Sequence, residues 1–456
     1  MLGPAVPPLA GRRLAPGGHK KAGRYFYRMR EAFRKRGWLV WGLLYALSVF
    51  LTLNRHAKSE LFTYHAELWS DKAGYYVYLP ATFLYGFEAR RFPAGINQRT
   101  GGGFDLDLAT NRVGTKYPYG VALLQAPFWL AAHALHPAAD GYSRLEQKSV
   151  DVAAATYFVL GLCLLYGTLR RGGYSAGVVA LTLAALALGT NLAHYALYET
   201  GMCHIYSFAG FALLLALLLR PGPPWWSPAT PAGRRWGIAA TAALLTVIRP
   251  IDGLLVLPLL LWPGAARPVA AAGAGRAIGA VLAMGLLLWL PQLVYYRYLH
   301  GSWLVYSYGG EGFPYWLHPR LAKIWLAPNN GSLLYNPLLA LVLGPGLWQL
   351  ARQRGWWAAW VGGSWLLLSY VYAAWWDGHL GCGYGGRGFV DSYPLLAWAA
   401  AAGLAWLLAR PAAGRWVGAA LVAALVGYNL YVMLHFDRCF QGQGDWDWPA
   451  YWRYLT

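Results

Sequence analysis

Long runs of apolar residues recur along the chain, and short polar or charged segments separate them. The runs cover residues 37–53, 117–136, 148–169, 174–190, 203–219, 236–248, 251–263, 277–297, 333–351, 356–376, 394–409 and 415–434. Several approach the roughly 20 apolar residues with which a helix crosses a bilayer, whereas a membrane β-barrel would show alternating segments of about ten residues. Because 57% of the residues are hydrophobic and 12% charged, the pattern predicts an all-α polytopic membrane protein.

Positive charge is concentrated at the start of the chain. Ten Lys and Arg residues lie within the first 36 positions, immediately before the first apolar run. The formal charge of +20 would otherwise suggest a nucleic-acid partner, but this placement follows the positive-inside rule. It predicts that residues 1–36 form a basic cytoplasmic tail on anionic lipid, with no nucleic acid bound. The first run ends in "NRHAKSE" without a small-residue cleavage site, so we expect a retained helix.

The arginines between later runs set the expected topology. If every run crossed the membrane, the Arg pairs at 170–171 and 234–235 would face outside, against the rule. The run 117–136 contains two prolines, and we expect it to dip into or lie on the outer face instead. Eleven crossings then remain, with the N-terminus inside, and only Glu31 of the 18 carboxylates falls inside. The expected parts are a membrane bundle over 37–435, a long structured first outer loop over 54–147 and an aromatic outer tail over 436–456.

Asp71 is the first candidate for chemistry. It lies among aromatic residues in "ELWSDKAGYYVYLP", shortly after the first run. Partial desolvation at the membrane interface would raise its pKa towards that of a useful general base. The alternative is a solvated loop acid paired with Lys72.

Two further candidates are cations at membrane boundaries. Lys116 precedes Tyr117 and Pro118 at the start of the run 117–136, where a cation suits a phosphate headgroup or simply anchors an interfacial helix. Arg249 and Asp252 break a long apolar stretch in "VIRPIDG". Ionisable groups at that depth indicate a functional site or a buried Arg249–Asp252 pair.

"NLAHYALYETGMCHIYSF" brings a second carboxylate, Glu199, with His194 and His204 five residues to either side. Helical metal-binding pairs usually fall four residues apart and have a third ligand. We therefore interpret His194 and His204 as interfacial residues with hydrogen-bonded rings, in preference to metal ligands.

The late segment "WWDGHLGCGYGGRGFVDSYP" is rich in glycine around Tyr384 and Arg387. Its backbone N–H groups and the Arg387 fork could hold an anionic group, and the segments 306–313 and 327–337 look like further walls of the same cavity. Cys382 and Cys439 should both face outside, where a disulfide is conceivable; two unpaired thiols are the favoured interpretation.

Taken together, short motifs along the chain resemble those of the GT-C fold glycosyltransferases, in particular the group with the protein O-mannosyltransferases and the lipid A aminoarabinose transferase. The motifs read D-x-x-G-Y-Y-x-Y-L-P from Asp71, K-Y-P-x-G from Lys116, R-P at Arg249 and G-x-x-x-G-x-R-x-x-x-D-x-Y-P around Arg387. The similarity covers residues 37 to 435 and matches a less characterised bacterial branch.

The resemblance implies a bundle of about 11 transmembrane helices in the bacterial inner membrane, with the active site facing the periplasm. It implies transfer of a sugar from a polyprenyl-phosphate carrier to an acceptor in the cell envelope, whether glycan, lipid or protein, with inversion at the anomeric carbon. The implied catalytic residues are Asp71, as general base, and Glu199. The implied substrate-binding residues are Tyr75, Lys116, Tyr117, His204, Arg249, Tyr384 and Arg387. "KYP" departs from the "KPP"-like motif of relatives.

The main alternative is a transporter or flippase for a lipid-linked glycan. Transporters collect ionisable groups near the midplane and often have repeated halves, whereas the acids here lie at the outer rim and no halves match. A non-catalytic scaffold would leave the order of outer acids and cations unexplained. No metal site is expected, although the acids could hold a divalent cation.

Overall fold

The computed structural model describes residues 37–54, 61–261, 271–436, 439–453 and 455. The basic tail predicted over 1–36 lies outside the described residues. The chain divides into two units, Met1–Leu47 and Ser48–Thr456. The described part of the first unit is the beginning of the helix Gly37–Asn54.

The first long loop carries structure of its own. A two-stranded antiparallel hairpin places Leu106 opposite Val113, and buried aromatic side chains fill the space beneath it. Its helices and strands are α2 (Asp71–Tyr76), α3 (Tyr78–Pro80), η1 (Ala81–Tyr85), η2 (Ala89–Arg91), α4 (Ile96–Arg99), β1 (Asp105–Asp107) and β2 (Arg112–Gly114).

The middle of the chain is helical. Its elements are α5 (Gly120–Leu135), α6 (Arg144–Arg171), α7 (Ala176–Gly189), α8 (Leu192–Leu197), α9 (His204–Leu218), α10 (Ala232–Ile248), η3 (Pro250–Asp252), α11 (Gly253–Leu260) and α12 (Ala271–His300). Helix α6 starts before its apolar run because Ser143 and Glu146 form a capping box: the Ser143 side chain accepts from Glu146 N, and the Glu146 carboxylate accepts from Ser143 N.

The last third alternates short and long helices. Its elements are α13 (Leu321–Leu326), α14 (Ser332–Tyr335), α15 (Leu338–Leu341), η4 (Val342–Gly346), α16 (Leu347–Gln353), α17 (Gly355–Ala374), η5 (Arg387–Ser392), α18 (Tyr393–Leu408), α19 (Ala412–His435) and α20 (Trp448–Trp452). The run predicted over 333–351 is thus broken into pieces. Pro337 lies between α14 and α15, and Pro345 lies in the π-helical turn η4, where proline removes a helical hydrogen bond.

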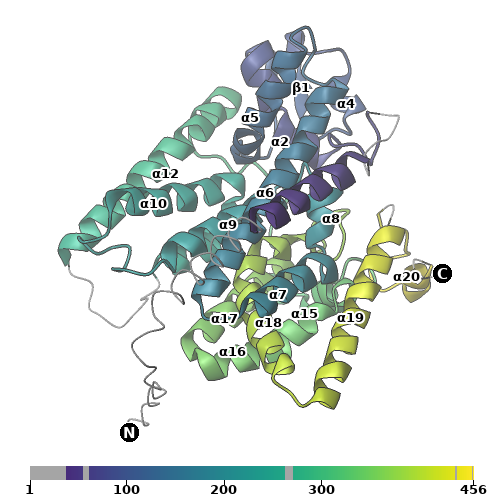
Figure 1. Ribbon diagram of the computed structural model, residues 1–456. Coiled ribbons are helices and arrows are strands. Elements are labelled where there is room, and N and C mark those ends of the chain that lie inside the picture. Colours follow the sequence, from purple (N-terminus) through teal and green to yellow (C-terminus); the bar gives the residue numbers. More distant parts are fainter. Residues whose placement is uncertain (1–36, 55–60, 262–270, 437–438, 454, 456) are drawn as a thin grey trace. The chain divides into compact units, whose positions relative to one another are not determined.

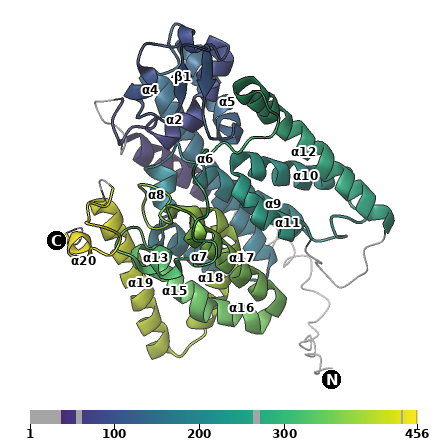
Figure 2. The same cartoon turned by 180° about the vertical axis from the view of Figure 1, so that it is seen from behind.

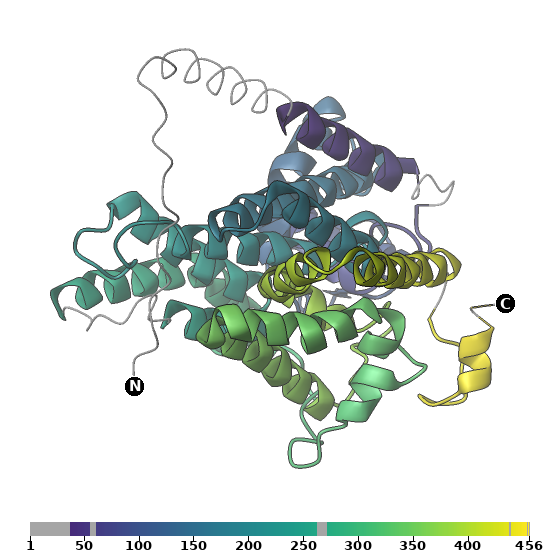
Figure 3. The same ribbon diagram turned by 60° about the horizontal axis from the view of Figure 1, so that its bottom comes forward.

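The long helices pack in neighbouring pairs. Helix α6 lies against α5 and α9, and α10 lies between α9 and α12 (Figure 1). The first-loop elements α2, α4 and β1 gather beside α5 in both views (Figure 2). Helices α18 and α19 pack on α7, with α16 and α17 on the other side of α18 (Figure 3). Segments far apart in sequence therefore meet at the ends of these helices.

Four of the described helices are long and apolar enough to cross a membrane: Gly37–Asn54, Arg144–Arg171, Ala274–His300 and Ala412–His435. Shorter apolar helices include Gly120–Leu135, Ala176–Gly189 and His204–Leu218. The described chain is therefore mostly helical with several apolar helices, as expected of a polytopic membrane protein. The number of eleven crossings stays a prediction.

Close backbone packing fixes the start of α2. A Cβ atom on Gly103 would lie 1.8 Å from Ser70 O and 2.8 Å from Gly74 N, so Gly103→Ala must push its loop away from α2. We expect a loss of about 1–3 kcal/mol in stability, typical of overpacking, seen as a lower thermal unfolding midpoint of the purified protein in detergent.

Gly363→Ala is the matched control, because a Cβ atom there meets open space within α17. This control should keep or raise the midpoint. An unchanged midpoint for Gly103→Ala would contradict the close approach of the two segments.

Candidate functional site

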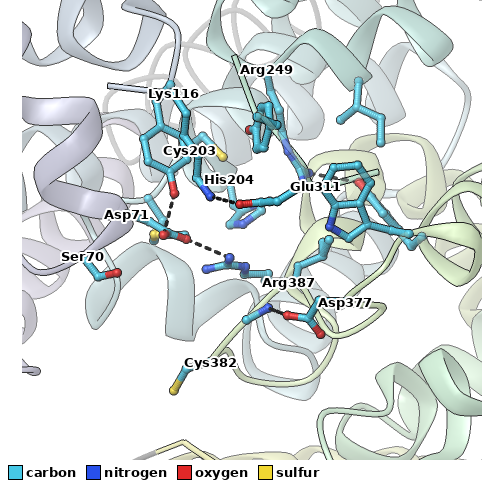
Figure 4. A pocket seen from close by; sticks show the side chains of 18 of the residues that line it. Ser70, Asp71, Lys116, Cys203, His204, Arg249, Glu311, Asp377, Cys382 and Arg387 are labelled. Atoms are coloured by element: carbon cyan, nitrogen blue, oxygen red, sulfur yellow. Dashed lines mark hydrogen bonds and ion pairs between the residues drawn. The ribbon is translucent and has the colours of Figure 1, made fainter. Parts of the chain in front are cut away.

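A single cavity of about 950 Å³ collects most of the residues singled out in the sequence. Its walls come from the first loop and α2, the start of α9, the corner between α10 and α11, the segment between α12 and α13, and the glycine-rich loop after α17. Figure 4 shows side chains from these separate segments facing one another.

Eight of the nine candidate residues line this cavity: Asp71, Tyr75, Lys116, Tyr117, Glu199, His204, Arg249 and Arg387. The ninth, Tyr384, is not among the described residues that line it. Its ring is fully buried, and its hydroxyl donates to the carbonyl oxygen of Asn429 at 3.0 Å. The structure does not bring Tyr384 to this cavity, because the ring packs into a separate core cluster with Tyr335 and Phe436. Its substrate role stays a prediction.

Asp71 is held by two side chains from other segments. Tyr117 donates its hydroxyl to Asp71 Oδ1 at 2.6 Å, and Arg387 Nη2 lies 2.8 Å from Oδ2 (Figure 4). Ser70, immediately before it, has φ 51, a conformation that non-glycine residues rarely adopt and that clusters at functional sites. The carboxylate thus sits at a fixed place on the cavity wall.

Burial alone would raise the pKa of Asp71, but the Arg387 charge, the Tyr117 hydrogen bond and the Lys116 charge lower it below its ordinary value. The expectation of a raised pKa is therefore wrong for the protein without substrate. The sequence could not show this, because Arg387 lies 316 positions away.

Lys72 does not pair with Asp71. Its Nζ lies 3.1 Å from Glu199 Oε2, and its side chain is almost fully buried. Because Asp71 and Lys72 are consecutive on α2, they point to different faces of the helix. Glu199 therefore reaches the cavity as the partner of Lys72.

Lys116 pairs with Glu311, a residue that was not among the candidates from the sequence. The two side chains lie 2.5 Å apart, Lys116 Nζ to Glu311 Oε1. The ammonium also lies 5.3 Å from the centre of the Tyr308 ring and 5.7 Å from that of Tyr117. The segment 306–313 is a wall of the cavity as expected, whereas none of the described residues 327–337 lines it.

Arg249 and His204 share one buried carboxylate, Asp391. Arg249 Nη1 donates to Asp391 Oδ2 at 2.6 Å, and His204 Nδ1 lies 2.9 Å from Oδ1. The alternative of an Arg249–Asp252 salt bridge is not found among the described residues, where Asp252 accepts from Ser207 Oγ at 2.6 Å. Asp391 was visible in the sequence as the D of the late motif, but its partners lie at the start of α9 and directly after α10.

Cys382 and Cys439 form a disulfide, with their Cα atoms 4.9 Å apart. The favoured interpretation of two free thiols is therefore wrong. The bond joins the glycine-rich loop to the segment after α19, and both residues line the cavity. With a sequence separation of 57 positions, no local spacing indicated the pairing.

Within the described part of the chain, no three His, Cys, Asp or Glu side chains come together as a metal site. Of the four cavity carboxylates, Asp71, Glu199 and Glu311 each face a Lys or Arg instead, and Asp377 accepts from the backbone N–H groups of His379 and Gly381. This arrangement does not fit a divalent cation, which prefers several uncompensated oxygen ligands.

The pKa of Asp71 gives a test of the site. The pKa of Asp71 is lowered in the folded protein, so the ionised carboxylate stabilises the fold at pH values above its ordinary pKa. This stabilisation is lost as the pH falls through the lowered pKa. Arg387→Gln removes the charge and leaves burial to raise the pKa. Carbodiimide labelling of Asp71, followed by mass spectrometry against pH, should show protonation at a higher pH in the variant.

Lys323→Gln is the control, because it removes a cation that pairs with Asp445 and lies outside the cavity lining. It should leave the protonation midpoint of Asp71 unchanged. A midpoint that does not move in Arg387→Gln would contradict the Asp71–Arg387 pair.

No family model and no curated protein matches the chain. Among solved structures, the crystal structure of ArnT from Cupriavidus metallidurans bound to undecaprenyl phosphate is similar, with a TM-score of 0.48 and 17% sequence identity. The match covers 85% of this chain and 64% of that one, so the chain spans less than two thirds of the length of ArnT.

Proposed function

We propose that the protein is an integral membrane glycosyltransferase, which moves a sugar from a polyprenyl-phosphate carrier to an acceptor outside the cytoplasm. One observation carries this proposal. A carboxylate, Asp71, and three cations, Lys116, Arg249 and Arg387, reach one cavity from four separate segments of a helical, apolar chain. A phosphate leaving group needs the cations, and a hydroxyl that loses a proton needs the carboxylate.

The reaction is a direct displacement. An acceptor oxygen attacks the anomeric carbon of the sugar and forms the new glycosidic bond. The bond between that carbon and the phosphate oxygen breaks, and the polyprenyl phosphate leaves with the electron pair. The proton of the acceptor passes to Asp71. Attack from the face opposite the leaving group inverts the anomeric configuration.

The low pKa of Asp71 suits this role once the donor has bound. Without donor, the positive charge of Arg387 lies beside the Asp71 carboxylate and keeps it ionised. A phosphate that attracts Arg387 and Lys116 draws away the two charges that lower the pKa of Asp71, and burial then raises the basicity of this carboxylate. The base therefore becomes effective when the leaving group is in place.

The remaining walls suit a lipid-linked sugar. The corner after α10 contributes the apolar side chains of Ile251 and Leu254, and the segment before α13 contributes those of Phe313 and Trp316. These side chains offer an apolar surface for the first isoprene units, while Tyr75 and Tyr117 offer aromatic faces and hydroxyls to a sugar. Under this proposal the cavity faces the periplasm of the bacterial inner membrane, and the acceptor is a cell-envelope glycan, lipid or protein.

The test compares envelope glycans by mass spectrometry in strains of the source organism that lack the gene, carry it intact, or carry Asp71→Asn at equal membrane abundance. We expect the deletion to lose one sugar and Asp71→Asn not to restore it, since removing a general base slows transfer by about 10²–10⁴-fold. Asp105→Asn, an exposed acid on β1, is the control and should restore the sugar.

Full restoration by Asp71→Asn would contradict the proposed base. A deletion strain whose glycans accumulate on the inner face with every linkage intact would contradict transfer itself and favour transport of a lipid-linked glycan.

A further inference from the structure

Every Lys and Arg side chain described in the cavity lining is already paired with an acid before any ligand enters. Among the described residues that line the cavity, four carry positive charge, namely Lys72, Lys116, Arg249 and Arg387, and four are acids, namely Asp71, Glu199, Glu311 and Asp377. The four cations are each in an ion pair, three with these acids and Arg249 with the buried Asp391. An anionic donor must therefore break at least one existing pair to reach a cation.

The pairs differ in how firmly they are held. Lys72 is almost fully buried against Glu199, and Asp391 is buried and bound by both Arg249 and His204. Buried pairs are costly to break, because each group would be left without a partner.

The Lys116–Glu311 pair is the more open one. The Lys116 and Glu311 side chains are 35% and 28% exposed. The other described contact of the Glu311 carboxylate is the Trp376 indole N–H, 3.3 Å from Oε2. Glu311 also lies in the segment between α12 and α13, where the structure places no helix or strand over residues 301–320. Water can solvate both groups when they separate, so this pair costs least to exchange.

One hydrogen bond attaches this segment to the backbone of Lys116, and a second lies within the segment. Ser307 Oγ donates to Lys116 O at 2.8 Å, and Tyr306 OH donates to Glu311 O at 2.8 Å. The Glu311 carboxylate thus contacts the Lys116 ammonium, at the position that a phosphate oxygen would take (Figure 4).

We propose that Glu311 is an internal substitute for the donor phosphate, bound to Lys116 until an anionic lipid displaces it. This inference rests on the proposed function and names how the same site selects its donor. A polyprenyl-phosphate sugar is a phosphodiester with one negative charge, so its phosphate can take the place of the Glu311 carboxylate on Lys116. A neutral glycolipid cannot make that exchange, and the cavity therefore discriminates by charge.

Glu311 also acts on the product. After transfer, the polyprenyl phosphate is a monoester that carries more negative charge than the donor and would bind the cations more tightly. Return of Glu311 to Lys116 competes with this product and favours its release. Glu311 is thus a specificity residue that does not itself touch the reacting atoms.

The experiment measures binding of polyprenyl phosphate to the full chain in nanodiscs, with the neutral polyprenol as a matched lipid. Glu311→Gln removes the competing charge and should tighten phosphate binding by about 10-fold, in keeping with the loss of one charge-assisted interaction. Polyprenol binding should not change. Glu88→Gln, an exposed acid paired with Arg91 outside the cavity lining, should bind as the wild type does.

A double-mutant cycle makes the result specific. The gain from Glu311→Gln should disappear when Lys116→Gln is also present, because the exchange needs both partners. Equal or weaker phosphate binding by Glu311→Gln, or a gain that survives Lys116→Gln, would overturn the inference while leaving the proposed function intact. Failure of every variant and of the wild type to bind polyprenyl phosphate would overturn both.

Discussion

The ion pair between Asp71 and Arg387 is the interaction on which the site depends. It joins residues 316 positions apart, the first from the long loop before α5 and the second from the glycine-rich loop before α18. Both side chains are largely shielded from water, so breaking the pair would leave charges poorly compensated. The pair brings the two loops together on one side of the cavity.

The other ion pairs close the cavity in the same way. Lys72 ties α2 to the segment before α9, and Lys116 ties the start of α5 to the segment before α13. Arg249 ties the end of α10 to η5 through Asp391. Each connection crosses between elements distant in sequence, and each leaves a cation beside the cavity. Under the proposed function, the charges that assemble the site are also those that bind the donor phosphate.

Much of the fold was visible in the sequence because apolar runs and proline positions act locally. The helices α6, α7, α9 and α17 fall on predicted runs, whereas the single run predicted over 333–351 is divided into short helices at Pro337 and Pro345.

The candidate residues were visible too, since ionisable groups beside apolar runs are rare. Their partners were not. The pairings of Asp71, Lys72, Arg249 and Cys382 all depend on how distant segments meet. The position of Tyr384 could not be predicted for the same reason: a tyrosine in a glycine-rich loop can face a cavity or fill a core, and only packing decides.

The most direct measurement is a structure of the protein in nanodiscs with polyprenyl phosphate bound. The account predicts that the phosphate lies within hydrogen-bond distance of Lys116 and Arg387, with Asp71 no longer paired to Arg387 and the isoprene chain along Leu254 and Trp316. Phosphate density outside this cavity, or bound lipid with the Asp71–Arg387 and Lys116–Glu311 pairs unchanged, would contradict it.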